Sequence, residues 1–88
     1  MQVDFTKHFS RQIDRECDKA LRDKLRGVVN TVMNAVTIRD IPGLKKLKGH
    51  ATAYRIRIGV YRVGLFIEDG RAIFAAFEHR KDIYNRFP

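Results

Sequence analysis

The fold of this chain is decided by residues 54–63, which have the sequence YRIRIGVYRV. Successive side chains of a β-strand point to opposite faces, so the tyrosine and the isoleucines share one face while Arg55 and Arg57 share the other. Gly59-Val60 is typical of a tight turn, because glycine adopts positive φ without steric cost. The stretch therefore predicts a β-hairpin in which Arg57 pairs with Arg62.

The predicted hairpin gathers three guanidinium groups, those of Arg55, Arg57 and Arg62, on one surface. Like charges directly across a strand pair are destabilising, so this arrangement requires either full solvation or a bound anion. The chain also carries 18 Lys and Arg against 10 Asp and Glu, a formal net charge of +8, which suits a polyanionic or acidic partner. Our working hypothesis is that the anion is an RNA phosphate.

Length and composition narrow the possible classes of protein. A chain of 88 residues is long enough for one domain, residues 1–88, with one two-layer core. Cys17 is the only cysteine, which excludes a disulfide framework and a thiolate metal cluster, and we expect no metal or cofactor. No apolar run approaches the ~18 residues of a membrane span, and the polar N-terminus is not that of a signal peptide, so we expect a cytoplasmic protein.

The N-terminal half predicts a strand followed by helices. Residues 2–5 alternate between polar and apolar side chains, which indicates a short strand, and Thr6 is a suitable N-cap. Asp18 can cap a second helix, although the absence of glycine and proline from residues 7–26 leaves one bent helix as the alternative. We favour an antiparallel helical pair packed on the sheet. Its apolar positions are Phe9, Ile13, Cys17, Leu21, Leu25, Val28, Val29, Val32, Met33 and Val36.

The segment 37–53 has the composition of a loop. Pro42-Gly43 indicates a turn, and Leu44 and Leu47 have the spacing of one helical turn anchored on the core. Basic side chains surround this anchor, and they are consistent either with a solvated surface or with the wall of a groove for a nucleic-acid backbone. The candidate RNA-binding residues are Lys45, Lys46, Lys48 and His50.

Two further strands are predicted at residues 61–68 and 71–78, joined by the strong hairpin signal Asp69-Gly70. Both faces of 71–78 are apolar, so this strand is expected to be central. In an ideal register Phe77 shares the face of the hairpin arginines. Arg80 then falls on the opposite face, unless a bulge intervenes or the strand has ended.

The C-terminal segment predicts one more helical turn. Ile83 and Phe87 are spaced four apart and are expected to face inward. Tyr84 lies beside them, and from spacing alone it is a surface-anchoring aromatic residue.

Four fragments, in this order after a helical pair, resemble the RelE/ParE superfamily of toxin–antitoxin toxins, and within it the RelE-type mRNA interferases. They are LKKLKG (44–49), YRIRI (54–58), YRV (61–63) and HRKDIY (79–84). The resemblance covers nearly the whole chain. It implies an α+β fold with an N-terminal strand, a helical hairpin packed on a mostly antiparallel twisted sheet, and a short C-terminal helix.

The resemblance also implies an activity and its partners. RelE-type toxins are endoribonucleases that cut mRNA without a metal, in many members only within the ribosomal A site, and so inhibit translation. The ribose 2′-hydroxyl attacks the adjacent phosphate and leaves a cyclic phosphate and a free 5′-hydroxyl. The implied partners are mRNA, the ribosomal A site and a cognate antitoxin protein that masks the basic surface.

Carried over residue by residue, the resemblance implies that the catalytic residues are Arg55, Arg57, Arg62, Arg80 and Tyr84. Some RelE-type toxins have lysines on the first hairpin strand, where one can serve in proton transfer. Both positions are arginine here, and arginine is a poor base because its pKa exceeds ~12. Tyr84 is therefore the preferred proton-transfer candidate and His79 the second, ahead of Glu78 and His50.

Two other functions stay open at this point. A ParE-like toxin shares the fold but inhibits DNA gyrase by binding protein, and its arginines would form a docking surface. A non-catalytic RNA-binding module would bind RNA tightly and in a salt-sensitive way without generating products.

Overall fold

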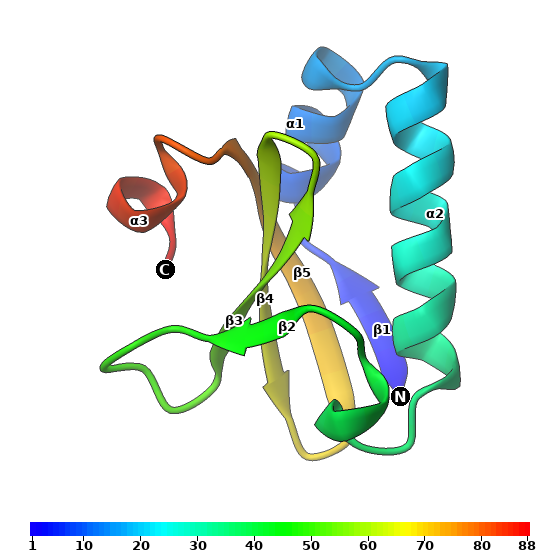
Figure 1. Ribbon diagram of the computed structural model, residues 1–88, viewed down its shortest axis with the longest axis vertical. Helices are drawn as coiled ribbons and strands as arrows, with labels where there is room; N and C mark the ends of the chain where they lie inside the picture. The colour runs from blue at the N-terminus through cyan, green and yellow to red at the C-terminus, as the bar shows by residue number, and fades with distance from the viewer.

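The computed structural model describes residues 1–88 as a five-stranded sheet with helices on both faces (Figure 1). Only β1 pairs in parallel, with β5, and every other strand pair is antiparallel, so the predicted α+β fold is confirmed. The strands are β1 (Gln2–Phe5), β2 (Leu44–Lys46), β3 (Ala53–Ile58), β4 (Tyr61–Glu68) and β5 (Arg71–His79), in the spatial order β1-β5-β4-β3-β2. The helices are α1 (Lys7–Glu16), α2 (Lys19–Asn34), the 3-10 helix η1 (Ile38–Asp40) and α3 (Ile83–Arg86).

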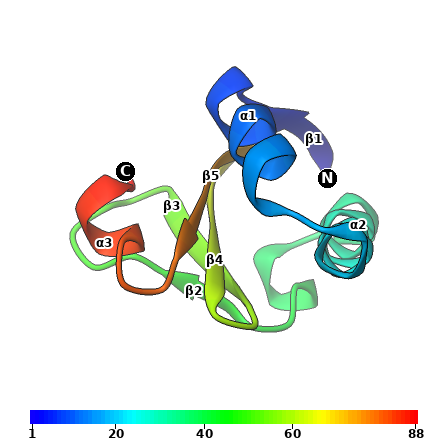
Figure 2. The same ribbon diagram turned by 90° about the horizontal axis from the view of Figure 1, so that it is seen from above.

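The sheet separates two apolar clusters of unequal size. Seen from above, α1 and α2 lie on one side of the sheet and α3 lies on the other (Figure 2). The larger cluster lies under α1 and α2 and includes Phe9, Leu25, Val32, Val63, Leu65 and Phe74. The smaller cluster lies under α3 and consists of Leu47, Ala53, Ala76, Ile83 and Phe87.

Side-chain caps resolve the helical region into two helices, as we favoured from the sequence. The Thr6 hydroxyl accepts a hydrogen bond from the N–H of Phe9 at 3.1 Å and begins α1. The Asp18 carboxylate accepts from the N–H of Leu21 at 2.9 Å and begins α2. Neither helix is long and apolar enough to cross a membrane.

The apolar stripe of α2 ends earlier than its sequence pattern predicts. Met33 is 54% exposed and Val36 is 84% exposed, so the prediction that both face the core is wrong. The helix ends at Asn34, and Val36 therefore lies beyond the last helical turn. The 3.6-residue period carries information about burial only while the chain is helical and the helix lies against the sheet.

The segment 37–53 is more regular than a loop, and the predicted helical turn at Leu44 is wrong. Leu44–Lys46 is a strand that pairs with β3, with Leu44 opposite Ile56 and Lys45 opposite Arg55. Leu44 still packs against the larger cluster, but it does so through strand alternation. The single fragment Leu44-Lys45-Lys46-Leu47 is compatible with either a helical or a strand period, and the pairing with β3 decides between them.

The hairpin of β3 and β4 has the predicted register, with Arg57 opposite Arg62. The pairing of β4 with β5, however, is irregular. Gly64 of β4 is opposite Ala76 of β5, and the next β4 residue, Leu65, is opposite Phe74, so Ala75 is an extra residue without a partner in β4. This bulge reverses the alternation that follows it. Phe77 therefore joins the larger cluster, and its predicted position on the arginine side is wrong.

Gly64 on β4 allows α3 to pack closely on the sheet. A Cβ atom at this position would lie 2.6 Å from the ring of Phe87, which is closer than real side-chain contacts permit. Phe87 is 5% exposed and packs in the smaller cluster. The absence of a side chain at Gly64 therefore sets the distance between α3 and the sheet.

We predict that Gly64→Ala destabilises the protein by about 1–3 kcal/mol, because overpacking forces Phe87 to move. Gly27→Ala is the control: Gly27 is an exposed residue within α2, and a Cβ atom there would meet nothing within 4 Å. That change should stabilise the protein by about 0.5–1 kcal/mol. The measurement is the free energy of unfolding in urea, and equal effects of the two variants would contradict the close contact.

Candidate active site

Four arginines from three consecutive parts of the chain meet on the α3 side of the sheet. The β3–β4 hairpin places Arg57 opposite Arg62, and Arg55 opposite Gly64. The bulge in β5 turns Arg80 to the same side, and the backbone N–H of Arg80 donates to the carbonyl of Val60 at 2.8 Å. We call Arg55, Arg57, Arg62 and Arg80 the arginine face.

Arg62 is held in place by its own hairpin. Its Nη1 atom donates to the carbonyl oxygens of Gly59 at 3.0 Å and Tyr61 at 2.9 Å. Those two bonds orient the guanidinium plane and leave Nε and Nη2 to bind another group. A guanidinium preorganised in this way can bind a phosphate bidentately.

The arginines of the arginine face form no ion pair with a carboxylate. Desolvation lowers the pKa of Arg62, and the charges of Arg57, Arg55 and Arg80 lower it further, while Tyr84 acts in the opposite direction. None of the seven ion pairs in the molecule involves an arginine of this face. The site therefore has the electrostatic properties of an anion-binding surface.

Tyr84 lies at the edge of the arginine face because α3 anchors on both sides of it. Ile83 and Phe87 are buried as predicted, while Tyr84 is 65% exposed. The Cζ atom of Arg55 lies 5.9 Å from the centroid of the Tyr84 ring, within cation–π distance. The phenol ring and hydroxyl therefore lie beside the guanidinium groups.

The predicted RNA-binding residues divide between two places. Lys45 is opposite Arg55 and therefore extends the arginine face onto β2, whereas Lys46 is opposite Tyr54 and has the alternation of the other face. Lys48 and His50 lie in the exposed turn after β2. The structure brings only Lys45 of this set next to the arginines.

His79 does not join the arginine face. It pairs with Tyr61 at the end of β5 and follows the alternation of Phe77, on the α1 side. Its ring lies 6.0 Å from the Tyr61 ring, and its Nδ1 accepts a hydrogen bond from the N–H of Lys81 at 3.2 Å. Of the two preferred proton-transfer candidates, Tyr84 and His79, only Tyr84 lies at this face.

Comparison with curated proteins identifies a relative that matches from end to end. The chain is 33% identical over 89 residues to Toxin RelE3 of Methanocaldococcus jannaschii, and the match covers 100% of both proteins. The chain belongs to the RelE family of toxins. The resemblance inferred from four short fragments is confirmed, as is the prediction of a toxin from a toxin–antitoxin system.

Solved structures of RelE proteins share the fold of this RelE-family toxin. A RelB–RelE antitoxin–toxin complex from Methanococcus jannaschii matches with a TM-score of 0.81 and 30% identity, over 98% of this chain and 100% of that one. The intact Escherichia coli RelBE toxin–antitoxin complex matches with a TM-score of 0.71, over 89% of this chain and 94% of that one, and at 18% identity it supports the fold alone. No family sequence model matches the chain.

Sequence reasoning missed one functional candidate in this RelE-family toxin, Gln12. It is 3% exposed and contacts Glu78, which is 6% exposed. The sequence does indicate that Gln12 is buried, because it is three residues after Phe9 and one before Ile13, within the apolar face of α1. A polar residue at such a position has to satisfy its amide inside the protein.

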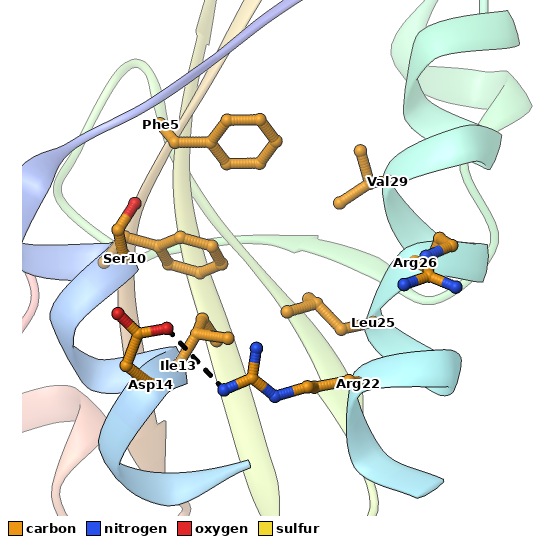
Figure 3. Close-up of a pocket in the computed structure, with 9 residues that line it drawn as sticks. Phe5, Ser10, Ile13, Asp14, Arg22, Leu25, Arg26 and Val29 are labelled. Carbon is orange, nitrogen blue, oxygen red and sulfur yellow. Dashed lines mark ion pairs between the residues drawn. The ribbon is translucent and has the colours of Figure 1, made fainter. Parts of the chain in front are cut away.

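A hollow of about 330 Å³ between α1 and α2 lies away from the arginine face (Figure 3). An ion pair between Asp14 and Arg22, at 3.6 Å, crosses between the two helices. Phe9 and Leu25, which line it, belong to the larger cluster on the opposite side of the sheet from Arg62. No group of three or more His, Cys, Asp or Glu residues in the chain is arranged to hold a metal ion.

We predict that Arg57→Gln raises the midpoint of thermal unfolding by a few degrees at low salt, because it removes a like charge directly opposite Arg62. The increase should shrink in high salt, which screens the repulsion. Arg71→Gln is the control, since Arg71 is also on a strand but pairs with Asp4 at 3.4 Å. A lower midpoint for Arg57→Gln than for the wild type would contradict net repulsion on the arginine face.

Proposed function

We propose that this RelE-family toxin is a metal-independent endoribonuclease that cleaves mRNA in the ribosomal A site and so inhibits translation. The observation that carries the proposal is the arginine face, in which four guanidinium groups that form no ion pair lie beside an exposed tyrosine. A surface that only kept the protein soluble would not require repelling charges to be held opposite one another. A polyanion relieves that repulsion when it binds.

The chemistry assigned to the face is attack of the ribose 2′-hydroxyl on the adjacent phosphate. The phosphorus becomes five-coordinate, negative charge accumulates on its non-bridging oxygens, and the bond to the 5′-oxygen breaks. Arg62, already oriented by Gly59 and Tyr61, stabilises this charge without reorganising, and Arg80 acts from the neighbouring turn. The products are a cyclic phosphate and a free 5′-hydroxyl.

The remaining residues of the face position the RNA. Arg55, Arg57 and Lys45 form a row across β3 and β2 that fits the phosphates next to the one attacked. Tyr84 offers a flat ring for a base to stack on and a hydroxyl that can orient the 2′-oxygen. We assign proton transfer to Tyr84, because the arginines around it do not release protons and His79 lies on the other face.

The partner proposed for the toxin is a cognate antitoxin. The similar Methanococcus jannaschii protein was solved as a RelB–RelE antitoxin–toxin complex. With a net charge of +8 and an unneutralised arginine face, this toxin fits an acidic segment, as an amphipathic helix or an extended strand. Such a segment would inhibit cleavage by occupying the site of the RNA phosphates.

We predict that the purified toxin cuts a reporter mRNA at discrete positions in a translation system that contains ribosomes. Arg62→Ala should lower the cleavage rate by about 10²–10³-fold, the usual effect of removing one preorganised donor to a developing charge. Arg71→Ala, at the far end of β5, should cleave like the wild type. The measurement is primer extension on the reporter.

The outcomes of that experiment separate the possible functions. Cleavage without ribosomes would retain the nuclease and reject dependence on the A site. RNA binding without products would identify a non-catalytic module. Intact mRNA together with inhibited DNA supercoiling would reject the proposal in favour of a gyrase-directed, ParE-like toxin.

We predict that expression of the toxin alone arrests growth and that co-expression of its antitoxin restores it. The affinity of the antitoxin should fall steeply between 50 mM and 500 mM salt if it binds the arginine face by charge (on the order of ten-fold or more). Calorimetric titration of the antitoxin into the wild-type toxin and into Arg57→Gln, at several salt concentrations, measures this dependence. An affinity that does not change with salt would indicate an apolar interface elsewhere.

A further inference from the structure

Glu78 is a buried carboxylate next to the basic arginine face. Its side chain is 7% exposed, and no ion pair joins it to Arg62, its cross-strand partner. Instead, its Oε2 atom accepts a hydrogen bond from Nε2 of Gln12, at 2.6 Å. A charge this deeply buried is costly unless it is paired and hydrogen-bonded, so its partners identify what it does.

The first partner closes an open edge of the sheet. β1 pairs with β5 only as far as Phe74, so the N–H of Phe77 has no strand partner. Gln12 Oε1 accepts from that N–H at 2.8 Å, while its Nε2 bonds Glu78. One side chain of α1 thus binds two consecutive residues just after the bulge.

The second partner comes from the opposite side of the sheet. Arg86 of α3 places Nη1 at 3.5 Å from Oε1 of Glu78. His8 of α1 lies further away, with Nε2 at 4.0 Å from Oε2. The contacts Gln12–Glu78–Arg86 therefore pass around the free edge of β5 and connect α1 to α3.

We propose that Gln12, Glu78 and Arg86 form a positioning chain for the active site, which holds Arg80 and Tyr84 in place relative to Arg62. This inference rests on the proposed nuclease function. Glu78 is two residues before Arg80, and Arg86 is two residues after Tyr84. Glu78 lies opposite Arg62 but is buried and forms no ion pair with it, so the three residues act on the reaction through the residues they hold.

The positioning chain supplies what packing alone does not. Ile83 and Phe87 fix the depth of α3 on the sheet, but they lie on one side of a helix of four residues. Such a short helix has almost no stability of its own, so a contact on another side is needed to fix its rotation. The Arg86–Glu78 ion pair is that contact, and the rotation of α3 determines where the Tyr84 hydroxyl points.

Hydrogen–deuterium exchange of the free toxin tests the chain without any RNA. Glu78→Gln keeps the size of the side chain but removes its charge, and Arg86→Gln changes an exposed residue without disturbing the core. Both variants should exchange faster in residues 80–88 than the wild type. Asp4→Asn, which breaks the Asp4–Arg71 pair at the other end of β5, should leave that segment unchanged.

Single-turnover cleavage tests the consequence for catalysis. Glu78→Gln and Arg86→Gln should each lower the maximal rate by about 10- to 100-fold, as displacement of reacting groups does, with little change in the RNA concentration for half-maximal rate. The double variant should be no slower than the slower single variant, because both break the same chain. Arg86→Lys should restore most of the rate.

Unchanged exchange in residues 80–88 for both variants would overturn the inference, as would equal losses of rate and RNA affinity. Cleavage by Arg86→Gln at the wild-type rate would also overturn it, and because Arg86 is exposed that variant is expected to fold. If the wild type itself fails to cut mRNA, the nuclease proposal falls, and faster exchange would still establish that the chain holds α3.

Discussion

One extra residue in β5 determines how both sides of the sheet are used. Phe74 and Phe77 are three apart, so a regular strand would send their rings to opposite faces, yet both pack under α1 and α2. The bulge at Ala75 makes this possible, and the same reversal turns Arg80 toward Arg62. It occurs where β1 ends, and residues of the N-terminal segment stabilise it: the Thr6 hydroxyl donates to the Ala75 carbonyl at 3.4 Å and Gln12 accepts from the N–H of Phe77. A buried core and a charged site thus depend on one local irregularity.

The larger apolar cluster and the arginine face make opposite contributions to stability. The larger cluster buries its aromatic and aliphatic side chains almost completely, and such burial is the dominant favourable term in folding. On the other side of the sheet, Arg57 and Arg62 face each other, and neither forms an ion pair with a carboxylate. The core under α1 and α2 therefore has to tolerate an unfavourable surface. A site that binds a polyanion gains affinity from the same uncompensated charge, because binding relieves it.

Much of this molecule is predictable from local sequence because its local signals agree with the fold. The hairpin register, both helix caps and the inward positions of Ile83 and Phe87 each depend on residues close in sequence. The errors arise where distant segments decide. The spacing of Leu44 and Leu47 fits both a helix and a strand, and only the pairing with β3 shows that the segment is a strand. The residues around Ala75 likewise carry no sequence signal for the bulge, which depends on where β1 ends. Of the candidate site, the grouping of Arg55, Arg57 and Arg62 was predictable from the hairpin. The side taken by Arg80 and the separation of His79 from the arginines both follow from the bulge.

The site divides into a rigid part and a part that is only lightly held. Arg55, Arg57 and Arg62 sit on paired strands, and the Arg62 guanidinium is bonded to its own turn. Tyr84 sits on a single turn of helix whose position depends on the Phe87 ring above Gly64 and on the Arg86–Glu78 pair. Binding phosphate tolerates small displacements, because Coulomb attraction changes slowly with distance. Alignment of a 2′-oxygen and transfer of a proton do not tolerate such displacements, because the reacting atoms have to meet within hydrogen-bond reach. The contacts that hold α3 should therefore affect the rate of the reaction more than the affinity for RNA.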